Sequence, residues 1–455
     1  MYQTKTLKEK INLFIFIFFP ILITQVSLNL MNFFDTVMSG RAGAQDLAGV
    51  AIGSSIWLPV FTGINGILLA ITPIIAHLLG ANSKDSITTK VQQAIYLSIG
   101  LGIIIILLGF ILLNPILNIM DLESEVRHIA KYYLITLGTG IIPLFIFNTL
   151  RCFMDALGQT RTSMFIILVA LPINVVLNYI FIFGKLGLPA MGGIGAGIAT
   201  AMTYVITTIF AFIILLRMKP FHQYQLLSNW VKPKFSDWVE QLKIGIPIGF
   251  AIFFETSIFA AVTLLMSAYS TNTIAAHQAA MNFTSLLYMI PLSVGIALTI
   301  TVGFEVGAKR MHDAKVYGYI GLSGGIFIAL FNGVILFLFR DFVASLYNND
   351  PEVVALTVQF IGFAIVYQLA DAFGAPIQGA LRGYKDVNMT LIIALISYWV
   401  IGLPTGWILA NFTTLEPFGY WVGIIVGLSF GAIFLLIRLV LIQRRYQIQQ
   451  NSSAN

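Results

Sequence analysis

Apolar stretches of about 20 residues or more follow one another along almost the whole chain, which limits the structures it can form. A helix of that length crosses a hydrocarbon core about 30 Å thick, and it satisfies its own backbone hydrogen bonds, as a bilayer requires. Of the 455 residues, 58% are hydrophobic and only 10% are charged, whereas soluble domains are about a quarter charged. The chain is therefore predicted to be an all-α polytopic membrane protein.

The apolar pattern divides into 12 expected transmembrane helices. Pro59 and Pro73 fall within the second of them and Pro376 within the tenth, so these spans are expected to kink or tilt. The expected spans are 12–37, 47–79, 91–118, 132–150, 163–184, 193–216, 244–267, 275–303, 316–339, 353–381, 388–411 and 419–442.

The basic residues indicate the topology, because cytoplasmic loops of helical membrane proteins collect Lys and Arg. If both termini are cytoplasmic, all but five of the 25 Lys and Arg residues fall on the cytoplasmic side. The net charge of +6 then reflects loops that face anionic lipid headgroups, and no nucleic-acid partner is expected. The five exceptions are Arg41, Arg127, Lys131, Lys185 and Arg340.

The two halves of the chain resemble each other, a frequent plan among transporters. Subtraction of residue numbers places Pro247 and Gly307 each 227 positions after Pro20 and Gly80. Six spans in each half make the repeats parallel and predict two pseudo-symmetric six-helix lobes. The predicted organisation is an N-terminal lobe over 1–216, a cytoplasmic linker over 217–243, and a C-terminal lobe with a short tail over 244–455.

Three acidic residues, Asp35, Glu255 and Asp371, lie inside apolar stretches with no Lys or Arg within one helical turn. A carboxylate at the bilayer centre costs roughly 2.5–3.5 kcal/mol on insertion scales, so a proton, a metal ion or a cationic substrate is expected to offset it. The alternatives are a hydrated or capping carboxylate at Asp35 and a protonated, hydrogen-bonded one at Glu255. Around Asp371, Gly374 and Pro376 predict a broken helix whose carbonyls could serve an ion.

Neutral amides form a second layer of candidates. Asn174 and Asn178 are four residues apart and share a helix face, and Gln278 and Asn282 repeat this spacing. Both pairs are predicted to line a substrate cavity or assist ion coupling. The alternative, hydrogen bonding between helices, is commonly worth under about 2 kcal/mol in membranes.

Several separated segments resemble the NorM-type branch of the multidrug and toxic compound extrusion (MATE) family. In the first half these are Phe34-Asp35-Thr36-Val37-Met38-Ser39-Gly40 and the run from Val50 to Pro59. In the second half they are Gly245-Ile246-Pro247, Phe253-Phe254-Glu255, Ala275-Ala276-His277-Gln278 through to Ser293, and Leu381-Arg382-Gly383-Tyr384-Lys385-Asp386. The resemblance covers nearly the whole chain.

This resemblance implies two lobes around a cavity that opens to alternate sides and exports amphipathic organic cations. Import of Na⁺ or H⁺ drives export in that family, with coupling assigned to the acids matching Glu255 and Asp371, to Tyr367, and to Asp35 in the first lobe. It also implies a multi-pass protein of the bacterial inner (plasma) membrane. The expected partners are cationic drugs and dyes and the bilayer, and the protein is expected to function as a monomer.

Either coupling ion fits the residues. Na⁺ prefers several oxygen ligands, and Glu255 and Asp371 with a phenol and backbone carbonyls could supply them. A proton needs fewer ligands, since neighbouring buried carboxylates bind protons more readily. We expect Na⁺ at the Glu255–Asp371 pair, with protonation open to Asp35, and no other cofactor.

Two other function classes remain as alternatives. A flippase for a lipid-linked precursor would favour a cavity rich in cations, and no Lys or Arg is expected in the middle of a span. A membrane enzyme would need a cluster of acids or His with a nucleophile, which the sequence does not display, so the protein is predicted not to be an enzyme.

Overall fold

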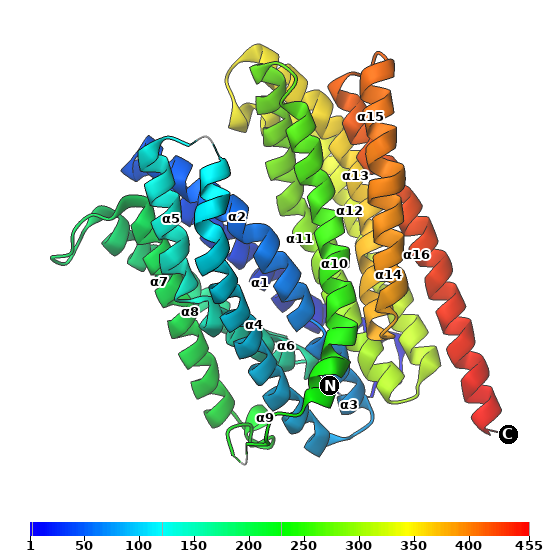
Figure 1. Ribbon diagram of the computed structural model, residues 1–455. Coiled ribbons are helices and arrows are strands. Elements are labelled where there is room, and N and C mark those ends of the chain that lie inside the picture. The colour runs from blue at the N-terminus through cyan, green and yellow to red at the C-terminus, as the bar shows by residue number, and fades with distance from the viewer. Residues whose placement is uncertain (2, 121, 229, 455) are drawn as a thin grey trace. The chain divides into compact units, whose positions relative to one another are not determined.

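The computed structural model describes residues 1, 3–120, 122–228 and 230–454, with side chains up to Ile448, and no strand occurs among these residues. Within this part of the chain, 11 helices are long and apolar enough to cross a membrane. A twelfth span results when one bent helix pair is counted as a single span. Figure 1 shows long helices lying side by side within each half. The predicted all-α fold with 12 spans in two six-helix lobes is confirmed.

The chain divides into two compact units, one made of residues 1–22 with 246–455 and the other of residues 23–245. Helix α1 (Leu7–Ala42) passes from one unit to the other between Leu22 and Ile23, and α10 (Phe235–Met266) does so between Gly245 and Ile246. Pro20 and Pro247 lie inside these helices close to the two crossings. Each sequence half thus contributes the start of its first helix to the other unit.

The unit of residues 23–245 follows the end of α1 with eight further helices and the start of α10. Its core packs the inner faces of α3, α4, α6, α7 and α8, where Ile75, Ile95, Phe153 and Ile166 are buried. The eight helices are α2 (Ala44–Leu68), α3 (Ile71–Gly80), α4 (Lys84–Ile119), α5 (Ser124–Gly138), α6 (Ile141–Ala156), α7 (Thr160–Phe183), α8 (Gly192–Arg217) and α9 (Lys219–His222).

The expected span 132–150 is not one straight helix. It is the bent pair, in which α5 and α6 meet at an angle of 52°. A Cβ on Gly140, at the break, would lie 2.7 Å from the Cα atom of Ala201 on α8. The glycine therefore lets the bend approach the α8 backbone, which a residue with a side chain could not do.

The segment between α8 and α10 is held against α4 by side chains rather than being a free tether. Gln92 and Gln93 are buried on α4, and each donates to one backbone carbonyl and accepts from one backbone amide of this segment. The carbonyls belong to Leu226 (2.9 Å) and Lys232 (2.9 Å), and the amides to Val231 (3.2 Å) and Lys234 (2.8 Å).

Removing these bonds should expose the segment to protease. In the double variant Gln92→Ala, Gln93→Ala, we expect trypsin to cut after Lys234 about tenfold faster or more, because each lost hydrogen bond contributes about 1 kcal/mol to keeping the segment docked. Timed proteolysis with mass spectrometry of the fragments measures the rate. Gln45→Ala, which removes a glutamine bonded instead to Glu123, should digest like the parent protein; equal rates in the double variant would show that these amides do not hold the segment.

The other unit combines the start of α1 with α10 beyond Gly245 and the remaining helices. Ser270 caps α11 by accepting from the Thr273 amide, and Asp350 caps α13 by accepting from the Glu352 amide. A π-helical turn, η1, interrupts one span between α14 and α15. The remaining helices are α11 (Thr271–Gly307), α12 (Met311–Tyr347), α13 (Pro351–Gly383), α14 (Val387–Ala394), η1 (Leu395–Gly402), α15 (Leu403–Phe412) and α16 (Pro417–Ala454).

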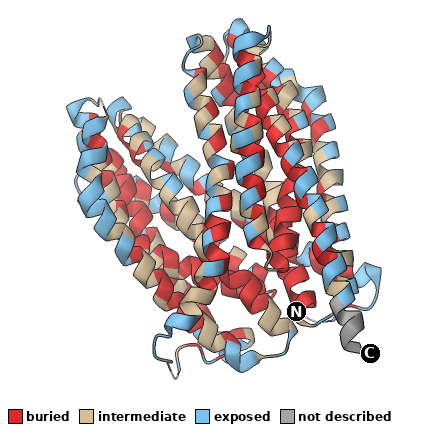
Figure 2. Cartoon of the chain, turned by 45° about the vertical axis from the view of Figure 1, so that its right-hand side comes forward, coloured by how far each residue is buried: buried red, intermediate tan, exposed pale blue. Residues whose placement is uncertain are grey.

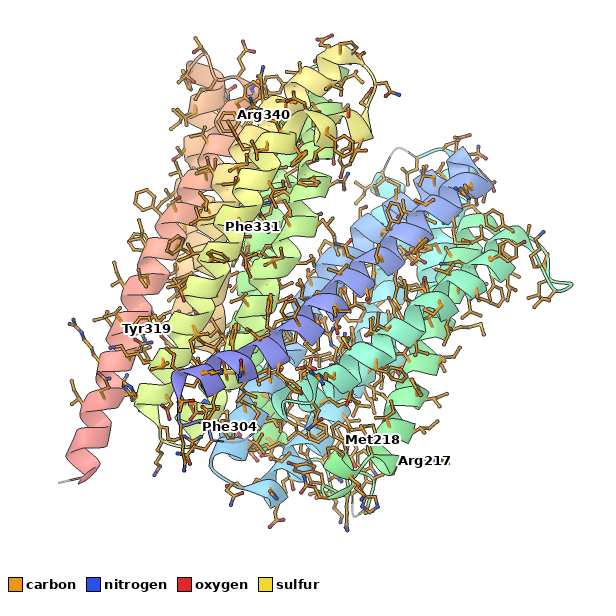
Figure 3. All side chains as sticks on the ribbon, turned by 180° about the vertical axis from the view of Figure 1, so that it is seen from behind. Arg217, Met218, Phe304, Tyr319, Phe331 and Arg340 are labelled. Carbon is orange, nitrogen blue, oxygen red and sulfur yellow. The ribbon has the colours of Figure 1, made fainter. Side chains whose placement is uncertain are left out.

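Large apolar side chains cover the outside of these helices. Figure 2 shows exposed positions running along the helices beside the buried ones, and Figure 3 shows Tyr319, Phe331 and Arg340 on α12. Phe331 is 60% exposed, and many of its apolar neighbours on α12 are exposed as well. Apolar surface of this extent is rare on soluble monomers and fits contact with lipid tails.

Candidate cation sites

Asp35 lies at the centre of a hydrogen-bonded group in the unit of residues 23–245. Asn178 on α7 donates to one carboxylate oxygen at 2.5 Å, and Thr200 on α8 donates to the other at 3.1 Å. Asn174, one turn before Asn178, accepts from the Asn178 amide at 3.1 Å and also bonds to Asp35. Asp35 is only 6% exposed, so these three neutral side chains replace the water that a carboxylate would otherwise bind.

Oxygen atoms therefore gather around Asp35 without a neighbouring cation in the group. The side-chain oxygen of Asn178 is buried and accepts no hydrogen bond from the residues that the structure describes, although a buried polar atom normally has a partner. With the Asp35 carboxylate, it provides acceptor atoms suited to a small cation or to a proton on the acid. The sequence predicted Asn174 and Asn178 as cavity residues, and the structure places both beside Asp35.

Glu255 on α10 lies in the interior of the other unit and has several partners. The Tyr288 hydroxyl on α11 donates to one carboxylate oxygen at 3.4 Å, and the Gln378 amide on α13 donates to the other at 3.3 Å. Tyr288, Tyr367 and Tyr398 all interact electrostatically with both Glu255 and Asp371. Two carboxylates and three phenols thus share one region of this unit.

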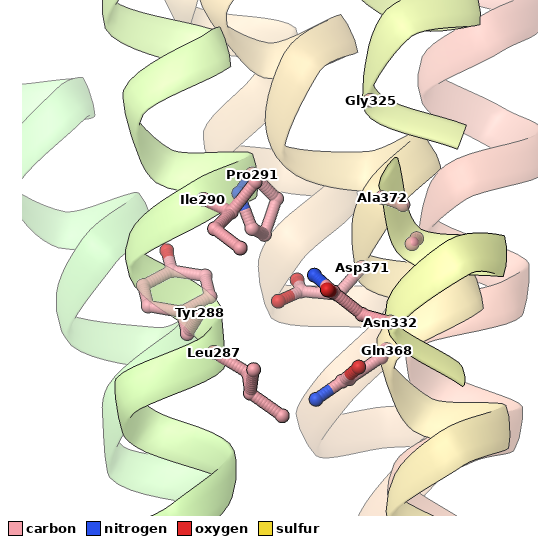
Figure 4. A pocket seen from close by; sticks show the side chains of 10 residues that line it. Leu287, Tyr288, Ile290, Pro291, Gly325, Asn332, Gln368, Asp371 and Ala372 are labelled. Carbon is pink, nitrogen blue, oxygen red and sulfur yellow. The ribbon is translucent and has the colours of Figure 1, made fainter. Parts of the chain in front are cut away.

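Asp371 differs from Glu255 because it faces a small pocket. The pocket has a volume of about 290 Å³, including space open to its surroundings, and its polar lining consists of Tyr288, Asn332, Gln368 and Asp371 (Figure 4). Desolvation and the charge of Glu255 act on the Asp371 carboxylate, with no hydrogen bond from a described residue. The buried amide nitrogen of Gln368 has no hydrogen-bond partner among the described residues either. The remaining lining is apolar and comes from α11, α12 and α13: Leu287, Ile290, Pro291, Gly325, Ala329 and Ala372.

The structure corrects the expectation that no basic residue lies near these acids. Arg382 follows directly after the expected span 353–381 and falls on the cytoplasmic side of the predicted topology. It belongs to α13, is only 8% exposed and interacts electrostatically with Glu255. Its guanidinium donates to the Gln378 side-chain oxygen at 3.3 Å. Since Gln378 in turn donates to Glu255, a polar chain connects the arginine with the acid.

Gln278 and Asn282 are not brought to the carboxylates. Both side chains are exposed on α11, and no described contact joins either of them to Glu255 or Asp371. Their predicted role in a cavity or in coupling stays a prediction. The neighbouring His277 is instead a packing residue, because the Trp421 indole donates to its Nδ1 atom at 3.0 Å and its Nε2 atom bonds to Thr263 at 3.1 Å.

Sequence reasoning missed several of the side chains that complete the two groups, including Tyr398. Thr200 lies far along the chain from Asp35, and Gln378 and Arg382 lie far from Glu255. Asn332 is one of several polar residues in an otherwise apolar span. One signal was available for Gln378 and Arg382, since they are four residues apart and seven and 11 residues after Asp371, so they could extend its helix.

The two groups suit small cations rather than a transition metal. Among the described residues, no group of three or more His, Cys, Asp or Glu side chains could hold a metal ion. The available donors are carboxylates, phenols, amides and a hydroxyl, which are the oxygen ligands that hard cations prefer. Either group could instead hold a proton on its acid.

Comparison with known proteins supports a single family. A relative from Oceanobacillus iheyensis, named "Probable multidrug resistance protein NorM", is 70% identical over 445 residues, covering 98% of this chain and 100% of the relative. Its namesake in Halalkalibacterium halodurans is 55% identical over 455 residues, covering 100% of this chain and 99% of the relative.

Solved structures share the fold. One is an outward-facing multidrug resistance MATE family transporter of the MOP superfamily, with a TM-score of 0.87 at 20% identity over 98% of this chain and all of that one. A eukaryotic MATE transporter matches with a TM-score of 0.84 at 21% identity over 98% of this chain and 99% of that one. The MatE family model matches two segments, residues 20–180 and 247–408, whose starts repeat the spacing of Pro20 and Pro247. The predicted resemblance is thus confirmed, and the chain belongs to the MatE family.

Proposed function

We propose that this protein exports amphipathic organic cations in exchange for a monovalent cation, Na⁺ or H⁺, by alternating access. The observation that carries the proposal is the Asp371 carboxylate, which is 2% exposed, faces a pocket and repels the nearby Glu255 charge. A negative group in that position needs a cation to stabilise it. The names of the relatives support drugs as the exported substrate.

The mechanism requires that ion and drug favour different states of the protein. A ligand shifts a conformational equilibrium only through its different affinity for the two states. A cation bound at Asp371 and Glu255 neutralises the site and favours the state that releases a cationic drug outward. Ion release inside restores the negative charge, which favours binding of the next drug. Asp35 with Asn174, Asn178 and Thr200 serves as a second cation site.

A lipid-linked precursor is less well matched as the substrate. Its pyrophosphate would need cationic groups, whereas the residues lining the described pocket include a carboxylate and no Lys or Arg. An enzymatic role has no support from the two polar groups, which hold no nucleophile paired with a base. We therefore infer transport without chemical conversion of the substrate.

The proposed location is the bacterial plasma membrane, with both termini in the cytoplasm. The excess of Lys and Arg in alternate loops supports this orientation. Cys152 is the only cysteine and is buried, so single cysteines introduced at loop positions can be labelled from one side of the membrane. A cysteine that replaces Ile448, near the C-terminal end of α16, is expected to react only from the cytoplasmic side. Labelling of this cysteine from the outside of intact cells would contradict the orientation.

The coupling ion can be identified in proteoliposomes loaded with a fluorescent cationic dye. An imposed Na⁺ gradient at equal pH on both sides is compared with an imposed pH gradient without Na⁺, and dye movement is followed by fluorescence. We expect the Na⁺ gradient to suffice, which would identify the Glu255–Asp371 pair as a sodium site. Transport with a pH gradient alone would identify a proton site, and no dye movement with either gradient would contradict the proposed antiport.

A further inference from the structure

The two carboxylates of the Glu255–Asp371 pair have different hydrogen-bond partners and different charged neighbours. Glu255 accepts from Tyr288 and from Gln378 and is attracted by the buried Arg382 guanidinium. Asp371 faces the pocket, and the charge–charge interaction acting on it comes from Glu255 and is repulsive. One acid therefore has a cation supplied by the protein, and the other does not.

The connection between Arg382 and Glu255 is built into one helix. Gln378 and Arg382 are four residues apart on α13 and therefore share a face. The amide of Gln378 is oriented by both neighbours, because its oxygen accepts from Arg382 at 3.3 Å and its nitrogen donates to Glu255 at 3.3 Å. All three side chains are at most 8% exposed, so water screens their charges little.

Burial makes an ionised arginine costly unless a negative charge compensates it. Arg382 stays protonated in a protein, and its Nε atom has no hydrogen-bond partner within the described part of the chain. The carboxylate that acts on it favourably is that of Glu255. The arrangement therefore connects Arg382 with Glu255 on α10 through Gln378, and not only with its own helix.

From this arrangement we infer that Arg382 is the internal counter-charge of the site and limits it to one monovalent cation. With both acids ionised, Glu255, Asp371 and Arg382 carry a combined charge of −1, which a single Na⁺ or proton neutralises. Without Arg382 the charge is −2, and the site attracts cations more strongly. Arg382 is a positioning residue in this scheme, acting on the ion through Gln378 and Glu255. The inference rests on the proposed cation coupling and specifies its charge balance.

For transport, the positive charge of Arg382 allows the bound cation to dissociate from the site. A site with two uncompensated carboxylates in a poorly hydrated interior would hold its cation tightly and release it slowly. The arginine weakens that attraction, so the ion can exchange during each cycle. Loss of the Arg382 charge should therefore strengthen ion binding and slow export. If Arg382 served only to stabilise the fold, its loss would weaken ion binding and slow export.

Binding of ²²Na⁺ to the purified full-length protein in nanodiscs at fixed pH tests the inference. All variants carry Asp35→Asn, so that binding in the other unit does not contribute. We expect Arg382→Gln to lower the half-saturating Na⁺ concentration about tenfold, since an opposite charge near a carboxylate changes its cation affinity by that order. Arg382→Lys, which retains the charge, should stay near the parent value.

A matched control is Arg438→Met, in the same unit. Arg438 is also paired with an acid, donating to Asp386 at 2.5 and 3.0 Å, but it is not among the groups acting on Glu255 or Asp371. Its removal should leave Na⁺ affinity unchanged. Unchanged or weaker binding in Arg382→Gln would overturn the counter-charge role.

Two further arms cover the remaining outcomes. If Arg382→Gln does not fold, Arg382→Met removes the same charge with a flexible apolar side chain and should also tighten Na⁺ binding; unchanged or weaker binding there would refute the inference. If the parent protein binds no Na⁺, sodium coupling fails, and the pH of half-maximal dye export becomes the measurement. Arg382→Gln should then move that pH upward by about one unit, while an unmoved value would count against Arg382.

Discussion

Replacement of Asp371 by Asn is expected to abolish ion-coupled export while leaving the protein folded in the membrane. The substitution keeps the size and shape of the side chain and removes its charge. Without that charge the site no longer binds the coupling cation. An ion gradient then cannot favour one conformational state of the protein over the other. Dye export from proteoliposomes should fall to the level of liposomes without protein.

The control for this result is Asp341→Asn. Asp341 is an exposed acid on α12 in the same unit, so its replacement removes the same charge without touching the pocket and should preserve export. Size-exclusion profiles and reconstitution yields establish that both variants are folded and inserted. Full export by Asp371→Asn under an imposed gradient would refute the role of this carboxylate.

A second large effect is expected from Gly379→Ala, this time on stability. Gly379 on α13 faces Gly295 on α11, and a Cβ added to it would lie 2.0 Å from the Gly295 carbonyl oxygen. The obstructing atoms belong to a helix backbone, so the two helices would have to separate. Thr299 on α11 donates to the Gly379 carbonyl at 2.9 Å, and this bond would be strained as well.

Overpacking of this kind costs about 1–3 kcal/mol and occasionally more. We expect the midpoint of thermal unfolding to fall by about 5–10 °C, measured by size-exclusion chromatography of heated samples. Gly374→Ala is the matched control, because Gly374 is a buried glycine of the same helix whose Cβ would meet no atom within 4 Å. Similar midpoints in the two variants would show that the close approach is not needed for stability.

Much of the fold was predictable because the bilayer imposes strict rules on sequence. The apolar stretches identified the spans, and the spacing between Pro20 and Pro247 identified the repeat. The structure differs where local geometry matters, as at the break beside Gly140 and at the π-helical turn η1. These features depend on which backbone packs against which, and hydropathy does not report that.

The acids at the two sites were also visible in the sequence, since an ionisable residue in an apolar span stands out from its neighbours. Their partners were not. Asn178 lies 143 positions from Asp35, and Gln378 lies 123 positions from Glu255. Arg382 lies one residue beyond the expected span 353–381, but α13 continues to Gly383 and keeps it buried.

The sequence by itself determined that this chain crosses the membrane in two repeated halves and buries Asp35, Glu255 and Asp371, because lipid tolerates few charges and no unpaired backbone. Only the tertiary structure decided that Glu255 is paired through Gln378 with Arg382 while Asp371 faces a pocket. Charge compensation depends on distances between side chains on different helices, and these distances are set when the helices pack.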